Sequence, residues 1–128
     1  MRIIVDSNII FSAMLNTNSL IGDILLNSQS TFDFISCDYL KTELANHKAR
    51  ILEISGYSKQ AYTELEYILL EQVSFLSEAL IPFEHWKAAA ELVREVDIDD
   101  IALVALSLFM GVVGLQIAIS ASIIWCCQ

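Results

Sequence analysis

Acidic side chains stand at three separate places in the sequence, each beside an apolar run. Asp6 follows the first run and Glu43 follows the second. A third group, which comprises Asp97, Asp99 and Asp100, precedes the last run. Carboxylates that converge repel one another unless a cation neutralises them, and Mg²⁺ or Mn²⁺ with oxygen ligands is the usual solution. Such a centre can act as a Lewis acid and lower the pKa of an attacking water.

Each of these acids also has a purely structural interpretation. An aspartate after a strand is often only a helix cap, which is an equal alternative for Asp6. A glutamate on a helix is more often a solvated surface residue than a metal ligand. For Glu43 considered alone, the surface role is therefore favoured. One of Asp99 and Asp100 is expected to cap a helix, because acids at a helix start gain roughly 0.3–1 kcal/mol from the dipole. Their joint occurrence in this order favours a common site.

Short strands and helices alternate along the chain. Buried parallel strands are predicted over residues 2–5, 32–36 and 73–76. The apolar spacing predicts helices over residues 9–14, 20–26, 40–54, 61–69, 86–93 and 101–110. The expected helix starts and stops are Ser7 and Asn8, Asp38, Gly56, Ser58 and Pro82. This alternation predicts an α/β fold with a parallel sheet covered on both faces, and ligands of such sheets gather beyond the carboxyl ends of the strands.

Composition limits the class of protein. The chain has 128 residues and 55% hydrophobic content, which fits one domain with one core and excludes a disordered chain. Sixteen acidic and seven basic residues give a net charge of -9, which argues against non-specific coating of nucleic acid. A metal-dependent enzyme acting on nucleic acid stays open, because the metal supplies the positive charge. Three cysteines and a start without a signal peptide favour the cytoplasm.

Three ordered blocks resemble a known family. They are residues 5–13 (VDSNIIFSA), 39–47 (YLKTELANH) and 97–106 (DIDDIALVAL). Together they are similar to the PIN domain, and within it to the VapC-like toxin components of bacterial toxin–antitoxin pairs. The likeness covers about residues 1–111. It implies a three-layer α/β/α fold and a ribonuclease that depends on Mg²⁺ or Mn²⁺.

The resemblance also implies roles for individual residues. Asp6, Glu43 and Asp100 would be catalytic metal ligands, with Asp97 as a helper or an alternative ligand. Asn8 would hold the first carboxylate or a water. RNA would be the substrate and an antitoxin protein the partner; a homodimer is expected by resemblance alone, and no membrane partner is expected.

Other polar residues near Glu43 have two interpretations each. His47 lies on or near the same helical face, and a structural or supporting role is favoured over a general base. Lys41, Lys48 and Arg50 share the predicted helix and could contact phosphates, but a solvated helix face is an equal alternative. Tyr39 could stack on a base, although packing at the core or rim is favoured.

The sequence departs from the family after the last predicted helix. PIN domains carry a fourth acid in that region, whereas this chain has no acid after Asp100. The expected division is a nuclease domain over residues 1–111 and an atypical apolar tail over residues 112–128. One hypothesis is that a frameshift near Gly111 replaced the family-like ending, which the coding DNA would decide. A membrane span within the uncharged residues 101–127 is a competing but less favoured interpretation.

The sequence is therefore compatible with three functions. The first is a PIN-type ribonuclease and toxin, impaired by loss of the fourth acid. The second is a catalytically inactive PIN-fold module that binds an antitoxin-like partner. The third is a small protein anchored in a membrane by its apolar tail.

Overall fold

Three short parallel strands form the centre of the fold. The computed structural model describes residues 2–94 and 100–111. Its strands are β1 (Arg2–Ile4), β2 (Asp33–Cys37) and β3 (Val73–Leu76). They lie in the order β1-β2-β3, with Ile3 beside Phe34 and Phe34 beside Val73. The carboxyl ends of the strands therefore meet at one edge of the sheet, as the sequence predicts.

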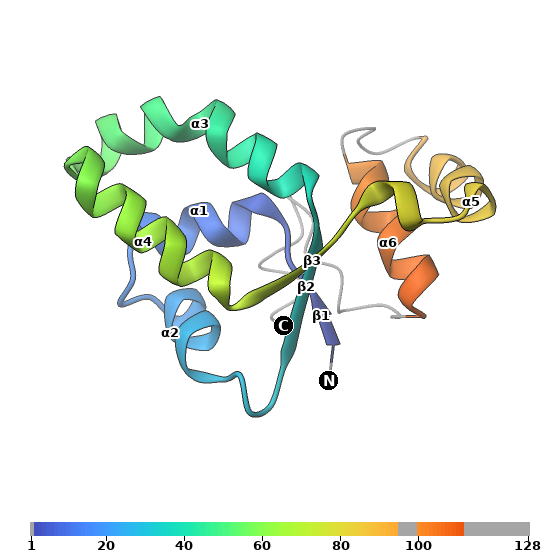
Figure 1. Cartoon of the computed structure of the whole chain (residues 1–128), viewed down its shortest axis with the longest axis horizontal. Helices are drawn as coiled ribbons and strands as arrows, with labels where there is room; N and C mark the ends of the chain where they lie inside the picture. Colours follow the sequence, from blue (N-terminus) through green and yellow to red (C-terminus); the bar gives the residue numbers. More distant parts are fainter. Residues whose placement is uncertain (1, 95–99, 112–128) are drawn as a thin grey trace.

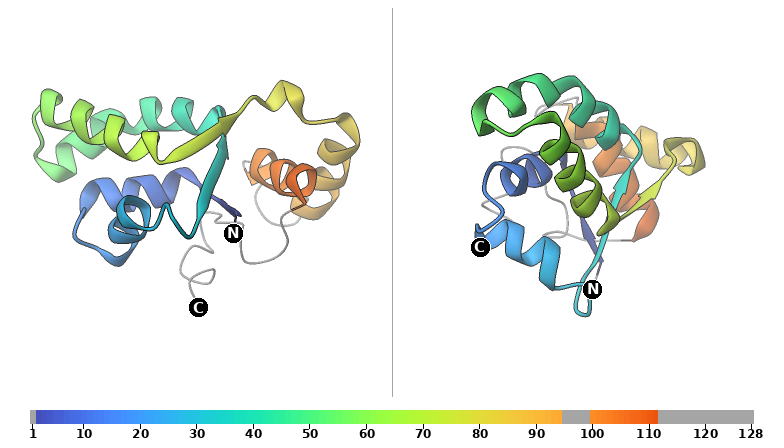
Figure 2. Two further views of the ribbon diagram at one scale, coloured as in Figure 1. Left: turned by 60° about the horizontal axis from the view of Figure 1, so that its bottom comes forward. Right: turned by 60° about the vertical axis from the view of Figure 1, so that its left-hand side comes forward.

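Helices cover both faces of this sheet, which confirms the predicted α/β architecture (Figure 1; Figure 2, left). One face carries α1 (Ser7–Leu15), α2 (Leu20–Asn27), α3 (Tyr39–Ser55) and α4 (Lys59–Glu71). The other carries α5 (Phe83–Val93) and α6 (Ile101–Met110), and a short 3₁₀ turn, η1 (Glu78–Leu80), lies between β3 and α5. The strands are thus the middle of three layers.

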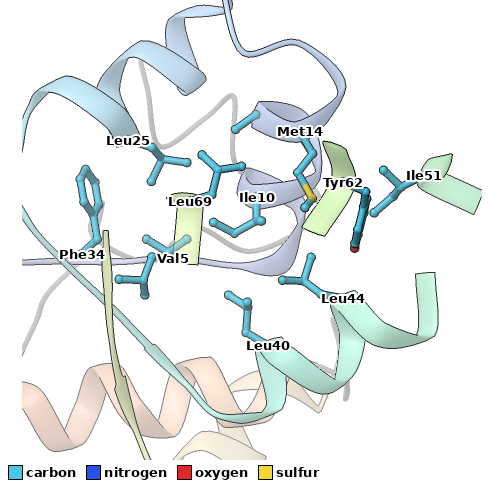
Figure 3. Close-up of a cluster of buried hydrophobic side chains, with 12 residues drawn as sticks. Val5, Ile10, Met14, Leu25, Phe34, Leu40, Leu44, Ile51, Tyr62 and Leu69 are labelled. Atoms are coloured by element: carbon cyan, nitrogen blue, oxygen red, sulfur yellow. The ribbon is translucent and has the colours of Figure 1, made fainter. Parts of the chain in front are cut away.

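Alternation along the strands divides the core into two clusters. Successive strand residues point to opposite faces. Phe34 accordingly packs with α1–α4, whereas Ile4 and Ile35 pack with α5 and α6. Figure 3 shows the larger cluster, in which Leu40 and Leu44 of α3 face Ile10 of α1. This packing holds the first turn of α3 over the start of α1.

The second strand begins one residue later than predicted. The N–H of Phe32 donates to the carbonyl of Ser28 (2.9 Å) and so belongs to the preceding turn. The ladder starts at Asp33, which pairs with Arg2, and it runs on to Cys37. The turn hydrogen bond therefore displaces the predicted strand by one position.

At the starts of α1 and α3, the residues predicted as caps make no capping hydrogen bond. Ser7 lies inside α1, and the cap position belongs to Asp6, whose side chain makes no capping hydrogen bond. Asp38 does occupy the predicted cap position of α3, but it has helical backbone angles and its side chain makes no capping hydrogen bond either. Instead, the carboxylate of Glu78 in η1 accepts a hydrogen bond from the backbone N–H of Tyr39. A distant acid thus caps α3 from across the sheet edge, which local spacing cannot reveal.

Other predicted boundaries are confirmed. Ser58 caps α4 by accepting from the N–H of Ala61 (3.1 Å), and Gly56 ends α3 with a φ of 73°. The apolar α6 is buried along much of its length and ends at Gly111, which has a φ of 68°. Asp100 occupies its cap position without a capping hydrogen bond, while Asp99 falls outside the described residues.

The predicted apolar tail, residues 112–128, lies outside the described residues. The frameshift hypothesis concerns these same residues. Within residues 2–94 and 100–111, no single helix combines the length and apolar character needed to cross a membrane. In the same described part of the chain, α1 and α2 pass that test when taken together, and a bend of 108° separates them.

Gly22 generates a prediction about stability. A Cβ at this position would lie 2.5 Å from the carbonyl oxygen of Thr17, so a side chain cannot enter without backbone movement. Gly22→Ala should lower the free energy of unfolding by about 1–3 kcal/mol, measured by chemical denaturation. Gly56→Ala is the comparison. An added Cβ there would meet nothing within 4 Å, so the substitution strains the backbone only through the positive φ of residue 56. A Gly22→Ala variant as stable as the unaltered protein would contradict the proposed close approach.

Candidate active site

A pocket of about 350 Å³ opens between α1, α3 and the start of α6. Its lining has a polar end and an apolar end. Asp6, Ser7, Asn8, Glu43 and Asp100 form the polar end. The rest of the lining comprises Phe11, Leu15, Ile51, Ile54 and Leu103, together with His47 and Arg50. The pocket therefore joins carboxylates to an apolar wall that also carries two nitrogen-bearing side chains.

The sheet delivers Asp6 into this pocket. The N–H of Val5 donates to the carbonyl of Ile35 (2.8 Å), while the Val5 carbonyl accepts from the hydroxyl of Ser36 (2.7 Å). Both backbone groups of the residue before Asp6 are thereby fixed to β2. Asp6 itself is only 4% exposed, and its carboxylate is not used as a helix cap.

Ser7 lies between two of the predicted acids. Its Oγ is 2.8 Å from Oε2 of Glu43 and 3.2 Å from Oδ1 of Asp6. A serine hydroxyl has a single proton to donate, so it serves one of these carboxylates at a time. Ser7 thus links α1 to α3 at the polar end of the pocket. The sequence interpretation of Ser7 as a cap missed this role, because the link depends on tertiary packing.

The polar end disfavours negative charge. The pKa of Asp6 is raised to about 6, first by burial and then by the charges of Glu43 and Asp100, although the Ser7 hydroxyl acts in the opposite direction. Oδ2 of Asp6 is buried, and no group of the described residues forms a hydrogen bond with it. A buried carboxylate oxygen of this kind calls for a cation or a proton.

The pocket brings together most of the acids predicted from the sequence. Asp6, Glu43 and Asp100 all line it, as does Asn8, whereas Asp97 lies outside the described residues. In the part of the chain that the structure describes, no three His, Cys, Asp or Glu side chains are grouped closely enough to hold a metal ion as they stand. The oxygen donors still fit Mg²⁺ or Mn²⁺ in kind, and Oδ2 of Asp6 is available as a ligand.

The three basic residues of α3 separate into two groups. Arg50 lines the pocket. Lys41 instead lies 3.9 Å from Oδ1 of Asp38, and Lys48 lies over the ring of Tyr62 at 5.3 Å from its centroid. Arg50 is therefore the member of this trio that lines the carboxylate pocket.

His47 and Tyr39 occupy different hollows. The ring of His47 packs edge-on against Phe11, with 5.3 Å between ring centroids, in the wall of the carboxylate pocket. This contact agrees with a structural role. Tyr39 lines a second, neighbouring hollow instead.

Comparison with protein families identifies the class. The family model described as PIN domain matches residues 4–113, which is most of the chain. The chain therefore belongs to the PIN domain family, and this membership indicates a nuclease-type function. The search of curated proteins finds no match. The search of solved structures finds none either.

The buried Asp6 generates a prediction about pH. Its pKa is higher in the folded protein than the ordinary value of 3.8, so the folded state binds this proton more tightly. The corresponding stability is present at low pH and is lost as the pH rises from about 4 to about 6. Without added metal, Asp6→Asn should therefore raise the free energy of unfolding at neutral pH by about 1–3 kcal/mol.

Below about pH 4 the stabilising effect of Asp6→Asn should vanish, because Asp6 itself is then protonated. Denaturation at both pH values measures the difference. Asp33→Asn is the matched control, since Asp33 is exposed at the start of β2. A stabilisation that persists unchanged at low pH would contradict the raised pKa.

Proposed function

We propose that this chain is a metal-dependent ribonuclease that hydrolyses RNA phosphodiester bonds as the VapC-like toxin of a toxin–antitoxin pair. The observation that carries the proposal is the pocket in which buried Asp6 is joined through Ser7 to Glu43 and faces the charge of Asp100. Membership of the PIN domain family supports it independently of this geometry.

The polar end of the pocket would hold the metal. Asp6, Glu43 and Asp100 would supply oxygen ligands, with Asp97 as the helper expected from the sequence. A bound Mg²⁺ or Mn²⁺ supplies Lewis-acid polarisation of the phosphoryl group and a lowered pKa for the attacking water. Ser7 orients the carboxylate of Glu43, and Asn8 adds a polar group at the same end.

The opposite end of the pocket would position the RNA. Arg50 is placed to bind a phosphate, since its guanidinium can donate two parallel hydrogen bonds. Phe11, Leu15 and Ile54 offer apolar surface on which the sugar and base of one nucleotide can lie. The overall charge of -9 means that binding depends on these few contacts rather than on a basic surface.

The biological setting is proposed from the resemblance to VapC-like toxins. An antitoxin protein would be the partner, and a homodimer is a further expectation. Within residues 2–94 and 100–111 the cysteine Cys37 is a buried free thiol, which fits the cytoplasmic location expected from the sequence.

A second candidate function is an inactive PIN-fold module that binds an antitoxin-like protein. Two observations favour it. Within the described residues no three metal-binding side chains are grouped as a finished site, and residues 101–128 contain no acid that could complete one. Metal binding and RNA cleavage separate this candidate from the nuclease.

RNA cleavage tests the nuclease directly. Asp6→Asn, Glu43→Gln and Asp100→Asn should each reduce Mn²⁺-dependent cleavage of single-stranded RNA by about 100-fold or more. Ser7→Ala should cost about 10–100-fold, the range for groups that support a metal ligand. Gel analysis of a labelled oligoribonucleotide measures the rate. Asp33→Asn should leave the rate unchanged, and a rate that survives Asp6→Asn would exclude this pocket as the source of activity.

Metal binding can be measured without any substrate. Titration calorimetry at neutral pH should show Mn²⁺ binding to the unaltered chain and no binding to Asp6→Asn. The affinity should fall near pH 5, because the raised pKa of Asp6 leaves its carboxyl largely protonated there. Failure of the unaltered chain to bind either Mg²⁺ or Mn²⁺ would favour the inactive partner-binding module.

A further inference from the structure

A second hollow, of about 410 Å³, lies directly beside the carboxylate pocket. It is lined by Asp38, Tyr39, Thr42, Glu78, Trp86, Ile101 and Ala102. Two pairs of consecutive residues connect the two spaces. Thr42 lines the second hollow and Glu43 the first, while Ile101 lines the second and Asp100 the first. The hollows therefore meet at the N-terminal turns of α3 and α6.

Flat aromatic side chains form part of this second hollow. Tyr39, in the first turn of α3, is 43% exposed, and Trp86 of α5 is half-buried. The position of Tyr39 is fixed, because its backbone N–H donates to the carboxylate of Glu78. Exposed aromatic rings on a fixed backbone are the platforms on which single-stranded bases stack.

The charges of the hollow select against a phosphate. Asp38 and Glu78 both line the hollow. When ionised, their carboxylates can only accept hydrogen bonds, so they repel an anion and bind hydrogen-bond donors. Lys41 lies 3.9 Å from Oδ1 of Asp38, and that carboxylate is about half exposed. A nucleobase with an amino group offers donors to such a carboxylate and a face to the aromatic rings.

We propose that this hollow is a nucleobase subsite for the nucleotide next to the cleaved phosphodiester. Tyr39 and Trp86 stack on the base, and Asp38 accepts a hydrogen bond from its amino group. Guanine presents two adjacent donors to a carboxylate, its ring N1–H and its amino group, whereas uracil presents only its N3–H, so guanine is favoured over uracil. This inference rests on the proposed ribonuclease function, and it adds a determinant of RNA preference outside the carboxylate pocket.

The test measures RNA binding separately from cleavage. The full chain with Asp6→Asn is titrated into labelled six-nucleotide RNAs in Mg²⁺ buffer, and fluorescence anisotropy gives the Kd. Adding Tyr39→Ala should weaken binding about tenfold, as expected for loss of one stacked base. Tyr39→Phe should restore it. Tyr67→Ala is the matched control, because Tyr67 is 64% exposed on α4 and lines neither hollow.

Base preference tests the carboxylate of the subsite. RNAs with a single guanine in a uracil background should bind more tightly than RNAs of uracil alone, and Asp38→Asn should narrow that difference. The subsite is overturned if Tyr39→Ala binds like Tyr67→Ala, if Asp38→Asn leaves the preference unchanged, or if no RNA binds. A protein or an apolar peptide as the true occupant would give the last of these results.

The outcome also separates this inference from the nuclease proposal. If the unaltered chain cleaves RNA but Tyr39→Ala binds normally, the subsite alone fails. If binding depends on Tyr39 while the unaltered chain cleaves nothing with Mg²⁺ or Mn²⁺, the nuclease proposal alone fails. Thermal unfolding of Tyr39→Ala confirms that the variant is folded before binding is compared.

Discussion

The repulsion between buried carboxylates is the constraint around which the site is organised. Asp6 carries its charge in a place where burial, Glu43 and Asp100 all oppose ionisation. Two hydrophobic cores, one on each face of the sheet, hold these acids at one edge despite that cost. The single hydroxyl of Ser7 relieves only part of it. The fold thus stores an unfavourable electrostatic arrangement that a bound cation would relieve.

The two core clusters contribute different parts of the site. The α1–α4 cluster fixes Asp6, Ser7 and Glu43 relative to one another, because α1 and α3 pack together through Leu40, Leu44 and Ile10. Asp100 comes from the other face of the sheet, at the start of the buried α6. The site therefore depends on both layers being packed against the same three strands (Figure 1).

Much of the fold was predictable because its signals are local. Apolar runs and periodicity marked the strands and the helices, and Gly56 and Ser58 marked helix boundaries through φ and capping preferences that the structure confirms. The rim position of Asp6, Glu43 and Asp100 followed from parallel strands sharing one carboxyl edge. The sequence did not predict the contacts that depend on tertiary packing. Neither the Ser7 link to Glu43 nor the Glu78 cap of α3 has a signal in sequence spacing.

The basic residues of α3 show the same limit. Lys41, Lys48 and Arg50 carry equal formal charge, and sequence alone offered no reason to rank them. Packing distinguishes them, because Lys41 is paired with Asp38, Lys48 lies over Tyr62, and Arg50 reaches the pocket. Helical spacing gives the face of a side chain, but neighbouring helices decide where its charged end goes.

The last residue of β2 carries a consequence for the redox chemistry of the protein. Cys37 is buried, and its pKa is raised to about 12 by burial and by the charge and hydrogen bonding of Glu78. Peroxides and alkylating reagents attack the thiolate rather than the thiol. Burial is the main reason that this sulfur is held as the less reactive thiol, and the same glutamate that caps α3 adds to the effect from the end of the neighbouring strand.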